Sequence, residues 1–207
     1  MPQVLSGAMN QHTRFQTMQI SVLRLPHDAY RWNLAVEYLK LRTRVFIEHM
    51  GWDLSSAEEM EFEQYDQLGR AAYIVAHEGE VVLGGARLLR CDHSLGGRSE
   101  TVSYMIRDAH LGRIDLPTEM CWAEPTTAPT SWELTRLVSV DRDPATARSI
   151  LNAANAYIKS QGGNECLFLG PPAFMRMARS FGYKPQALGP IVGNQDGRFL
   201  AFSCRVI

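Results

Sequence analysis

Residues 71–90 read AAYIVAHEGEVVLGGARLLR, and this stretch decides the fold class. Two apolar runs, 71–77 and 81–90, flank the turn-prone sequence EGE, which is the pattern of two strands joined by a tight turn. The second run is apolar on both faces of the expected strand. We therefore expect the two strands to belong to a sheet that is covered on both sides.

Further strands and helices are predicted on both sides of this pair. Asp28 is expected to cap a helix that runs to about Met50, where Gly51 ends it. The other expected elements are strands at 19–25, 132–140, 166–169, 187–193 and 199–206, and helices at 144–162 and 173–180. This order predicts an α/β or α+β fold with a mixed central sheet flanked by helices.

A chain of 207 residues is long enough for one well-buried core and short for two. We expect a loose N-terminal arm over residues 1–18 and a single domain over 19–207. Residues 91–131, with a short helix around 103–110, form either an insertion or a functional lid. A net charge of -1 provides no general attraction to nucleic acid or to a membrane surface, and no segment is long and apolar enough for a membrane span. A cytoplasmic location is expected.

The four cysteines are scattered, without a CxxC pair or a histidine at ligand spacing. Neither a zinc site nor a disulfide framework is predicted. Arg42 and Phe46 share a face of the first expected helix, and Trp52 follows its end. Aromatic faces attract cations and stack on bases, although two core aromatic residues and a solvated arginine would fit the same pattern.

Charged residues in unusual places complete the set of candidates. Glu63 and Asp66 lie in an acidic stretch of a kind that is usually a solvated surface. Arg87 lies in the apolar strand and is either paired with a buried carboxylate or faces a cleft. Glu133 and Arg136 are three apart in another strand, so they point to opposite faces unless a bulge reunites them.

The order and spacing of these residues carry a resemblance to a known family. LRTRVFIEHMGWDL (41–54), EFEQYD (61–66), GGARLL (84–89) and WELTR (132–136) closely resemble the motif series of the acyl-homoserine-lactone synthases of the LuxI type. That family shares its fold with the GCN5-related N-acetyltransferases. The resemblance covers residues 41–140 in motifs and continues weakly through 160–183.

The resemblance implies specific roles. Arg42, Phe46 and Trp52 match the family's lid and S-adenosylmethionine pocket, which Glu63 and Asp66 complete. The implied catalytic residues are Arg87, Glu133 and Arg136.

The chain departs from the family pattern at several positions. Glu63 replaces the family's first Asp, and RLLRC replaces RLLPT. Phe168 stands where synthases of 3-oxo-acyl signals carry Thr, so we expect it in the acyl pocket and expect a product without a 3-oxo group. The alternative is that Phe168 points into the core on the other face of the sheet, since neighbours in a strand alternate sides.

The implied reaction acylates the amine of S-adenosylmethionine from an acyl thioester and closes the lactone, releasing methylthioadenosine. Glu133 is the candidate base or amine-positioning group. The acyl donor is acyl carrier protein or coenzyme A, S-adenosylmethionine is a substrate, and no cofactor or metal is required. The alternatives are a generic acetyl-CoA N-acetyltransferase, against which the glycine-free VDRDPATAR (140–148) argues, and a catalytically silent relative that binds carrier protein or S-adenosylmethionine.

Overall fold

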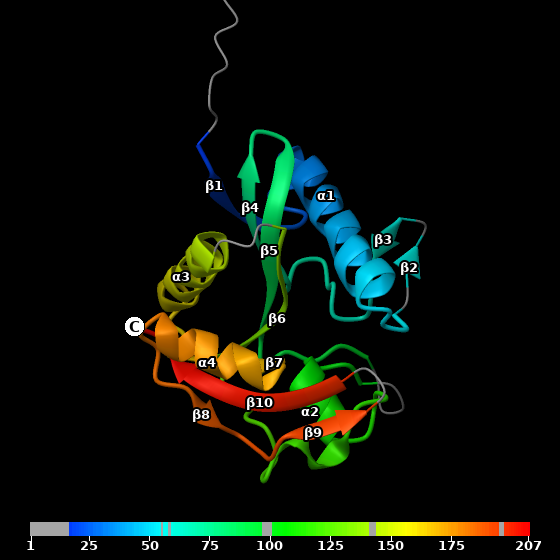
Figure 1. Ribbon diagram of the computed structural model, residues 1–207, viewed down its shortest axis with the longest axis vertical. Helices are drawn as coiled ribbons and strands as arrows, with labels where there is room; N and C mark the ends of the chain where they lie inside the picture. The colour runs from blue at the N-terminus through cyan, green and yellow to red at the C-terminus, as the bar shows by residue number, and fades with distance from the viewer. Residues whose placement is uncertain (1–16, 55, 58, 97–100, 141–143, 195–196) are drawn as a thin grey trace, which may run out of the picture.

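The structure is a computed structural model that describes residues 17–207 except 55, 58, 97–100, 141–143 and 195–196. Its centre is an eight-stranded mixed sheet (Figure 1). In spatial order the strands are β1 (Gln19–Arg24), β4 (Ala72–Glu78), β5 (Val81–Arg90), β6 (Ser131–Ser139), β7 (Glu165–Gly170), β10 (Gly197–Arg205) and β8 (Gln186–Ala187), while β9 (Val192–Asn194) also pairs with β10. Neighbours are antiparallel except for the parallel pair β6–β7. The predicted fold class is confirmed.

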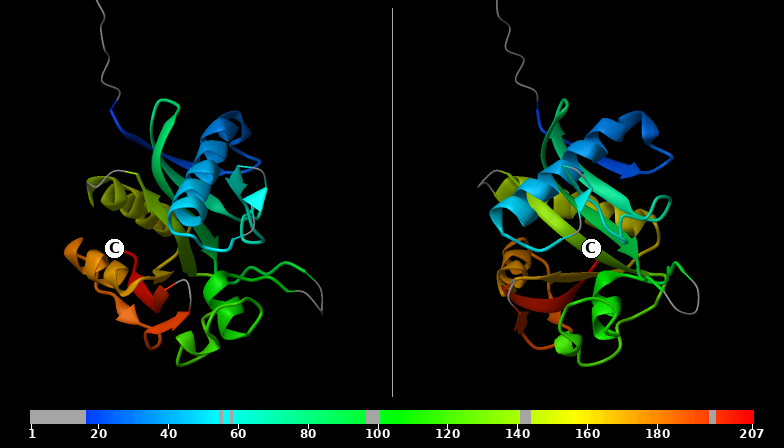
Figure 2. Two further views of the ribbon diagram at one scale, coloured as in Figure 1. Left: turned by 45° about the vertical axis from the view of Figure 1, so that its right-hand side comes forward. Right: turned by 90° about the vertical axis from the view of Figure 1, so that its right-hand side faces the viewer.

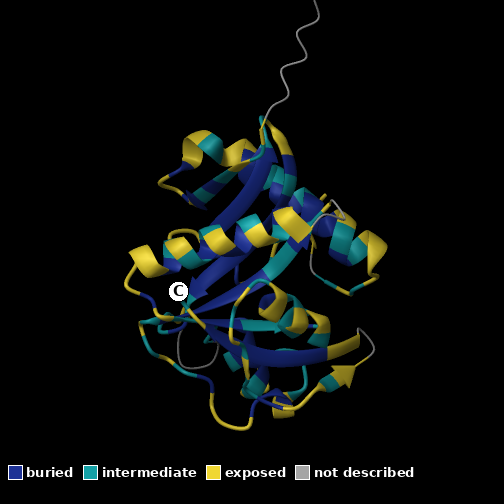
Figure 3. Ribbon diagram, turned by 60° about the vertical axis from the view of Figure 1, so that its left-hand side comes forward, coloured by how far each residue is buried: buried dark blue, intermediate teal, exposed yellow. Residues whose placement is uncertain are grey.

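Helices cover both faces of this sheet (Figure 2). On one face lies α1 (Trp32–Arg42), preceded by a 3₁₀ turn (Ala29–Arg31) and continued by a π-helical segment (Thr43–His49). The other face is covered by α3 (Pro144–Ser160) and α4 (Pro172–Ser180). The strands are buried between helices whose outer faces are exposed (Figure 3). This burial on both faces explains why the central strands are apolar throughout.

The remaining elements are short. They are α2 (Met105–His110), a 3₁₀ turn (Thr118–Met120) and a two-stranded ribbon of β2 (Ser56–Ala57) and β3 (Met60–Glu61). The helix predicted around 103–110 is therefore confirmed. The strand expected at 187–193 is wrong in its extent, because β8 and β9 are separate. Between them Gly189 lies so close to the main chain of Met120 that a Cβ atom would meet the carbonyl oxygen at 1.9 Å.

The predicted capping role of Asp28 is wrong. Its Oδ2 accepts a hydrogen bond from the Arg24 N–H at 2.8 Å, and its Oδ1 lies 2.9 Å from His27 Nδ1. The carboxylate therefore stabilises the turn that leaves β1 instead of the start of a helix. The predicted end of the helix is confirmed, since Gly51 follows it with φ +71°, a conformation that favours glycine.

Gly85 allows α1 to lie directly on β5. A Cβ atom at Gly85 would meet the Tyr38 ring at 2.7 Å. With glycine there, Tyr38 reaches across the strand and donates a hydrogen bond from its hydroxyl to the Arg136 carbonyl at 2.8 Å. The second glycine of the GGARLL motif thus fixes where the first helix lies relative to β6.

Two irregularities in β6 open the sheet. Between Gly85 and Arg87 on β5, two steps match the three steps from Thr135 to Val138 on β6, so β6 contains a bulge. The ladder between β6 and β7 runs from Ser131 to Leu134, although β6 continues to Ser139. Beyond Leu134 the two strands part.

The expected N-terminal arm, residues 1–18, lies outside the described residues as far as residue 16. The single domain expected over residues 19–207 stays a prediction. Within the described part of the chain no helix is long and apolar enough to cross a membrane.

Candidate active site

A cleft of about 610 Å³ opens where β6 and β7 part. The parted strands form one wall, and the π-helical segment with the loop after it forms another. The acidic stretch before β4 and the residues around α2 form the remaining walls of the cleft. The residues that line the cleft include Val45, Phe46, Met50, Trp52, Asp53, Glu63, Tyr65, Met105, Asp115, Thr135, Arg136, Leu137, Leu169 and Phe174.

Six charged side chains form a closed ring beside this cleft. We call it the charge ring: Glu61, Arg42, Asp66, Arg87, Glu63 and Arg136, in the order in which each contacts the next. Arg42 pairs with Glu61 and binds both oxygens of Asp66 at 2.7 and 2.9 Å.

The other two arginines complete the ring. Arg87 lies 3.0 Å from Asp66 and 2.7 Å from Glu63. Arg136 closes it, at 3.1 Å from both Glu61 and Glu63.

The ring is buried yet electrically balanced. Three guanidinium groups alternate with three carboxylates, so the formal charges cancel, as buried ion pairs require. Burial raises the pKa of the Asp66 carboxyl, but Arg87 and Arg42 outweigh this effect and hold the pKa well below its ordinary value. Burial also raises the pKa of Glu63, and Arg87 followed by Arg136 lowers it overall. Both carboxylates are therefore ionised at neutral pH.

In this acidic stretch, of a kind that is usually solvated, two carboxylate residues are buried. Asp66 is 3% exposed and Glu61 is 0% exposed. Glu61 was missed as a site residue. A signal for it exists, because Glu61, Glu63 and Tyr65 alternate and would share one face of an extended segment.

Arg136 occupies the β6 bulge in a strained conformation. Its φ of +55° makes it the sole non-glycine residue with positive φ among the residues described. Such a conformation costs about 1–3 kcal/mol and is typical of functional sites. The bulge places the Arg136 guanidinium on the α1 side of the sheet, the same side as Glu133. The sequence predicted that Glu133 and Arg136 would share a face only if β6 contained a bulge, and β6 contains one.

An aromatic pair lines the cleft next to this guanidinium. The Phe46 and Trp52 rings are stacked, with centroids 5.1 Å apart and planes at 10°. The Arg136 guanidinium lies 5.6 Å from the Phe46 ring centroid. The π-helical segment that carries Phe46 is a geometry frequent at functional sites. Phe46 and Trp52 are therefore grouped as expected, whereas the Arg42 guanidinium lies in the charge ring, 5.6 Å from the Tyr38 ring centroid.

Glu133 holds the start of α2. Its carboxylate accepts hydrogen bonds from the Met105 N–H at 3.0 Å and the Ile106 N–H at 2.8 Å. Burial raises the pKa of Glu133 to about 7, against the opposing effects of these two N–H groups and of Arg87. Among the described residues it is Met105, and not Glu133, that lines the cleft.

This raised pKa predicts a specific pH dependence of stability. As the pH rises from about 4.5 to about 7, the unfolded chain loses the Glu133 proton first, so ionisation costs the folded state about 3 kcal/mol in total. Glu133→Gln removes this titration. The free energy of unfolding of the wild type should therefore fall more steeply over this window than that of the variant, measured by urea denaturation at several pH values. Parallel curves would contradict the assignment.

Hydrogen bonds that the sequence did not predict connect the acidic stretch to α2. The Tyr65 hydroxyl donates to Asp108 Oδ2 at 3.1 Å, and Asp108 also accepts from the Ser103 N–H at 2.9 Å. The Arg87 guanidinium lies 5.6 Å from the Tyr65 ring centroid. Tyr65 thus links one wall of the cleft to the charge ring.

Phe168 lies on the face of the sheet opposite to the open cleft. Because neighbours in a strand alternate sides, Leu169 lines the cleft while Phe168 faces α3 and α4 on the other side of the sheet. There it lines a separate apolar cavity of about 30 Å³. Phe168 therefore does not line the open cleft, and its place in the acyl pocket stays a prediction.

Comparisons with known proteins find similar sequences and similar folds. The autoinducer synthase family matches residues 28–109. The chain is 28% identical over 185 residues to the acyl-homoserine-lactone synthase of Acinetobacter nosocomialis, covering 82% of this chain and 90% of that one. It is also 28% identical over 160 residues to the synthase of Pseudomonas aeruginosa, covering 76% and 72%.

Solved structures share the fold. A structure of TofI in a ternary complex with an inhibitor and MTA gives a TM-score of 0.72 at 24% identity, covering 91% of each chain. The acyl-homoserine-lactone synthase LasI gives 0.75 at 21%, covering 93% of this chain and 91% of that one. An N-acetyltransferase-like protein from Lactobacillus plantarum gives 0.56 at 15%, covering 92% and 99%. The chain is thus similar to the autoinducer synthase family over residues 28–109 and to acyl-homoserine-lactone synthases over most of its length, and it shares the fold of the solved synthase structures.

Proposed function

We propose that the protein transfers an acyl group from a thioester to the α-amine of S-adenosylmethionine and closes the product into an N-acyl-homoserine lactone, a quorum-sensing signal, releasing methylthioadenosine. The curated relatives are acyl-homoserine-lactone synthases. The neighbouring structure of BjaI, 17% identical with a TM-score of 0.76, holds SAM and isopentyl-CoA. Each of these likenesses supports the proposal.

The partial exposure of two members of the charge ring supports the proposal most directly. Four members of the charge ring have side chains that are 0% exposed, whereas Glu63 is 12% exposed and Arg136 is 6% exposed. Both of these line the cleft. The ring therefore presents one carboxylate and one guanidinium side by side, which matches the α-ammonium and α-carboxylate of an amino acid.

The neighbouring aromatic pair suits the rest of this substrate. Aromatic faces attract a cation such as a sulfonium and stack on a base such as adenine. Phe46 and Trp52 stand beside Arg136 on the cleft wall. We assign the amino-acid end of S-adenosylmethionine to Glu63 and Arg136, and its sulfonium and adenosyl end to the two rings.

The chemistry then follows from the ionisation of Glu63. An ionised carboxylate held at low pKa binds the ammonium but is a poor proton acceptor, so Glu63 positions the amine and the proton leaves to water. An α-amine has an ordinary pKa of about 7.7–8.0, which leaves a usable neutral fraction at slightly alkaline pH. The neutral nitrogen forms the amide bond to the thioester carbon while the carbon–sulfur bond breaks, and the proton that the nitrogen loses passes to the departing sulfur, which leaves as the thiol. The α-carboxylate oxygen then attacks the γ-carbon, whose bond to the sulfonium breaks to release methylthioadenosine.

The acyl carbonyl needs hydrogen-bond donors for its developing negative charge. The ladder with β7 ends at Leu134, and the following residues of β6 line the cleft instead. We assign the oxyanion to a backbone N–H of β6 beyond Leu134 other than that of Val140, which donates to the Leu83 carbonyl at 2.9 Å.

Glu133 acts through α2 in this scheme. Both of its oxygens accept N–H groups of α2, and Met105 of that helix forms part of the cleft wall. We propose that Glu133 is a positioning residue, and that Arg42, Asp66 and Arg87 hold Glu63 and Arg136 in place. No metal or cofactor enters these steps, S-adenosylmethionine is a substrate, and a cytoplasmic location stays a prediction.

The acyl donor can be tested through charge. Acyl carrier protein is acidic, and exposed cations lie on or beside the C-terminal helices: Lys159, Arg176, Arg179 and Lys184. The rate with a carrier-protein donor should fall steeply with salt and on the double change Arg176→Glu with Arg179→Glu, measured as thiol release. Charge reversal at Glu37 and Glu59, near α1, is the control. Equal rates with coenzyme A thioesters and no salt effect would show that this face is only solvated.

Cells that express the protein provide the test of function itself. Lactones extracted from their medium and identified by mass should be absent from cells that express Arg136→Ala at equal protein level. A medium without any lactone, despite a folded protein and both substrates, would leave the silent relative as the better description.

A further inference from the structure

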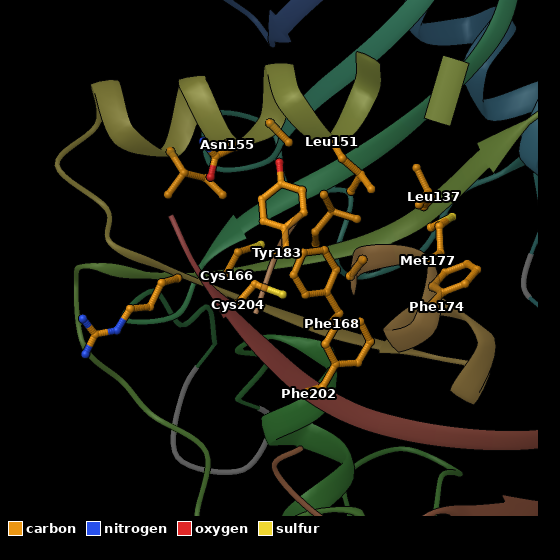
Figure 4. A pocket seen from close by; sticks show the side chains of 15 residues that line it. Leu137, Leu151, Asn155, Cys166, Phe168, Phe174, Met177, Tyr183, Phe202 and Cys204 are labelled. Atoms are coloured by element: carbon orange, nitrogen blue, oxygen red, sulfur yellow. The ribbon is translucent and has the colours of Figure 1, made fainter. Parts of the chain in front are cut away.

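The open cleft and the small apolar cavity are neighbours that share a wall. The cavity lies between the sheet and the helices α3 and α4 (Figure 4). Leu137 and Phe174 line both spaces. An apolar chain that enters the cleft between β6 and β7 therefore reaches the Phe174 ring before it can reach the cavity.

Phe174 is held in this place by its surroundings. It lies in the first turn of α4, and its N–H donates to the Pro171 carbonyl at 2.8 Å. Its ring rests on Gly170 at the end of β7, where a Cβ atom would meet a ring carbon at 2.7 Å. The glycine therefore allows the ring to close the gap between the strand and the helix.

The space behind Phe174 is almost full. The Phe168 and Phe202 rings are stacked there, with centroids 5.0 Å apart and planes at 11° (Figure 4). The remaining volume of about 30 Å³ is room for about two water molecules, since each needs about 10–15 Å³. The cavity cannot take several methylene groups unless a ring moves.

We propose that Phe174 limits the length of the acyl chain, so that the protein selects short apolar acyl groups whose far end stops at the Phe174 ring. The inference rests on the proposed function and names the class of its acyl substrate. Both residues of the shared wall, Leu137 and Phe174, are apolar, so an oxygen on the chain would find no hydrogen-bond partner there. Replacing the ring by a methyl group joins the cleft to the cavity.

The test compares three variants in competition between straight-chain four-, eight- and twelve-carbon thioesters. Phe174→Ala should raise the ratio of twelve-carbon to four-carbon product by about tenfold or more, since two further buried methylenes already give that factor. Phe174→Trp should lower the eight-carbon product relative to the four-carbon product. Phe181→Ala is the matched control, because Phe181 packs against Arg148 and contributes to neither space. Its product ratios should equal those of the wild type.

A binding measurement separates this inference from the function on which it rests. N-dodecanoyl-homoserine lactone, titrated into the protein, should bind Phe174→Ala more tightly than the wild type by a similar factor, whether or not turnover occurs. A tighter complex without turnover supports the inference and contradicts the proposed function. Unchanged product ratios in Phe174→Ala, with four-carbon turnover retained and binding unaltered, would overturn the inference alone.

Discussion

Replacing Arg87 with alanine is expected to lower the free energy of unfolding by about 3–5 kcal/mol and to abolish lactone synthesis. The Arg87 side chain is 0% exposed and lies between Glu63 and Asp66. Its removal leaves the Glu63 and Asp66 carboxylates beside each other without the cation that they share. Asp66 would keep Arg42, whereas Glu63 would lose half of its support at the cleft.

Urea denaturation and an assay of methylthioadenosine release together check this expectation. Arg90→Ala is the matched control, since Arg90 lies on the same strand but pairs with Asp92 near the surface, with a side chain 34% exposed. Its loss should cost less than about 1 kcal/mol. An Arg87→Ala protein within 1 kcal/mol of the wild type, still active, would show that the charge ring neither stabilises the fold nor shapes the site.

Glu63→Gln is expected to lower the rate by about a hundredfold or more, equivalent to about 2.7 kcal/mol, while Glu63→Asp stays within about tenfold. Glutamine keeps the size of the side chain but removes the charge that faces both the substrate ammonium and two arginines. Aspartate keeps the charge on an arm shorter by one methylene.

The two variants should also differ in pH dependence. Without the anion at position 63 the bound amine loses its proton more easily, so the Gln variant should recover part of its rate at lower pH than the wild type needs. Glu59→Gln is the control, because that side chain is 83% exposed. Equal rates for Glu63→Gln and the wild type would show that this charge has no role.

Much of this fold could be predicted from the sequence because the strands carry a local signal. The apolar runs at 71–77 and 81–90 correspond to β4 and β5, and Gly51 ends the first helical region as expected. The prediction that Asp28 caps the helix was wrong because a short carboxylate can accept a hydrogen bond within a turn as readily as at a helix end. Here it accepts one from the Arg24 N–H.

The site was harder to predict because its partners lie far apart in the chain. Glu61 is 19 residues from Arg42 and 75 from Arg136, so no local pattern shows that these charges neutralise one another. The family resemblance identified most of the ring residue by residue, but it did not include Glu61. The bulge at Arg136 could be stated only as a condition, since it depends on how β5 and β6 pair.

Glu133 and Phe168 show where a residue pattern is weakest. The position of Glu133 in a strand did not reveal that α2 would approach it with two N–H groups. Phe168 was placed at the acyl chain by resemblance, whereas strand alternation directs it to the opposite side of the sheet from the neighbouring Leu169.

Product stoichiometry in a reaction of the purified protein tests the central claim most directly. With S-adenosylmethionine and a four-carbon acyl thioester, the account predicts equal amounts of free thiol, methylthioadenosine and N-acyl-homoserine lactone, and none of the three with Arg136→Ala. Free thiol with an acylated acceptor but no methylthioadenosine would contradict it, because that result describes an acyltransferase that does not close a lactone.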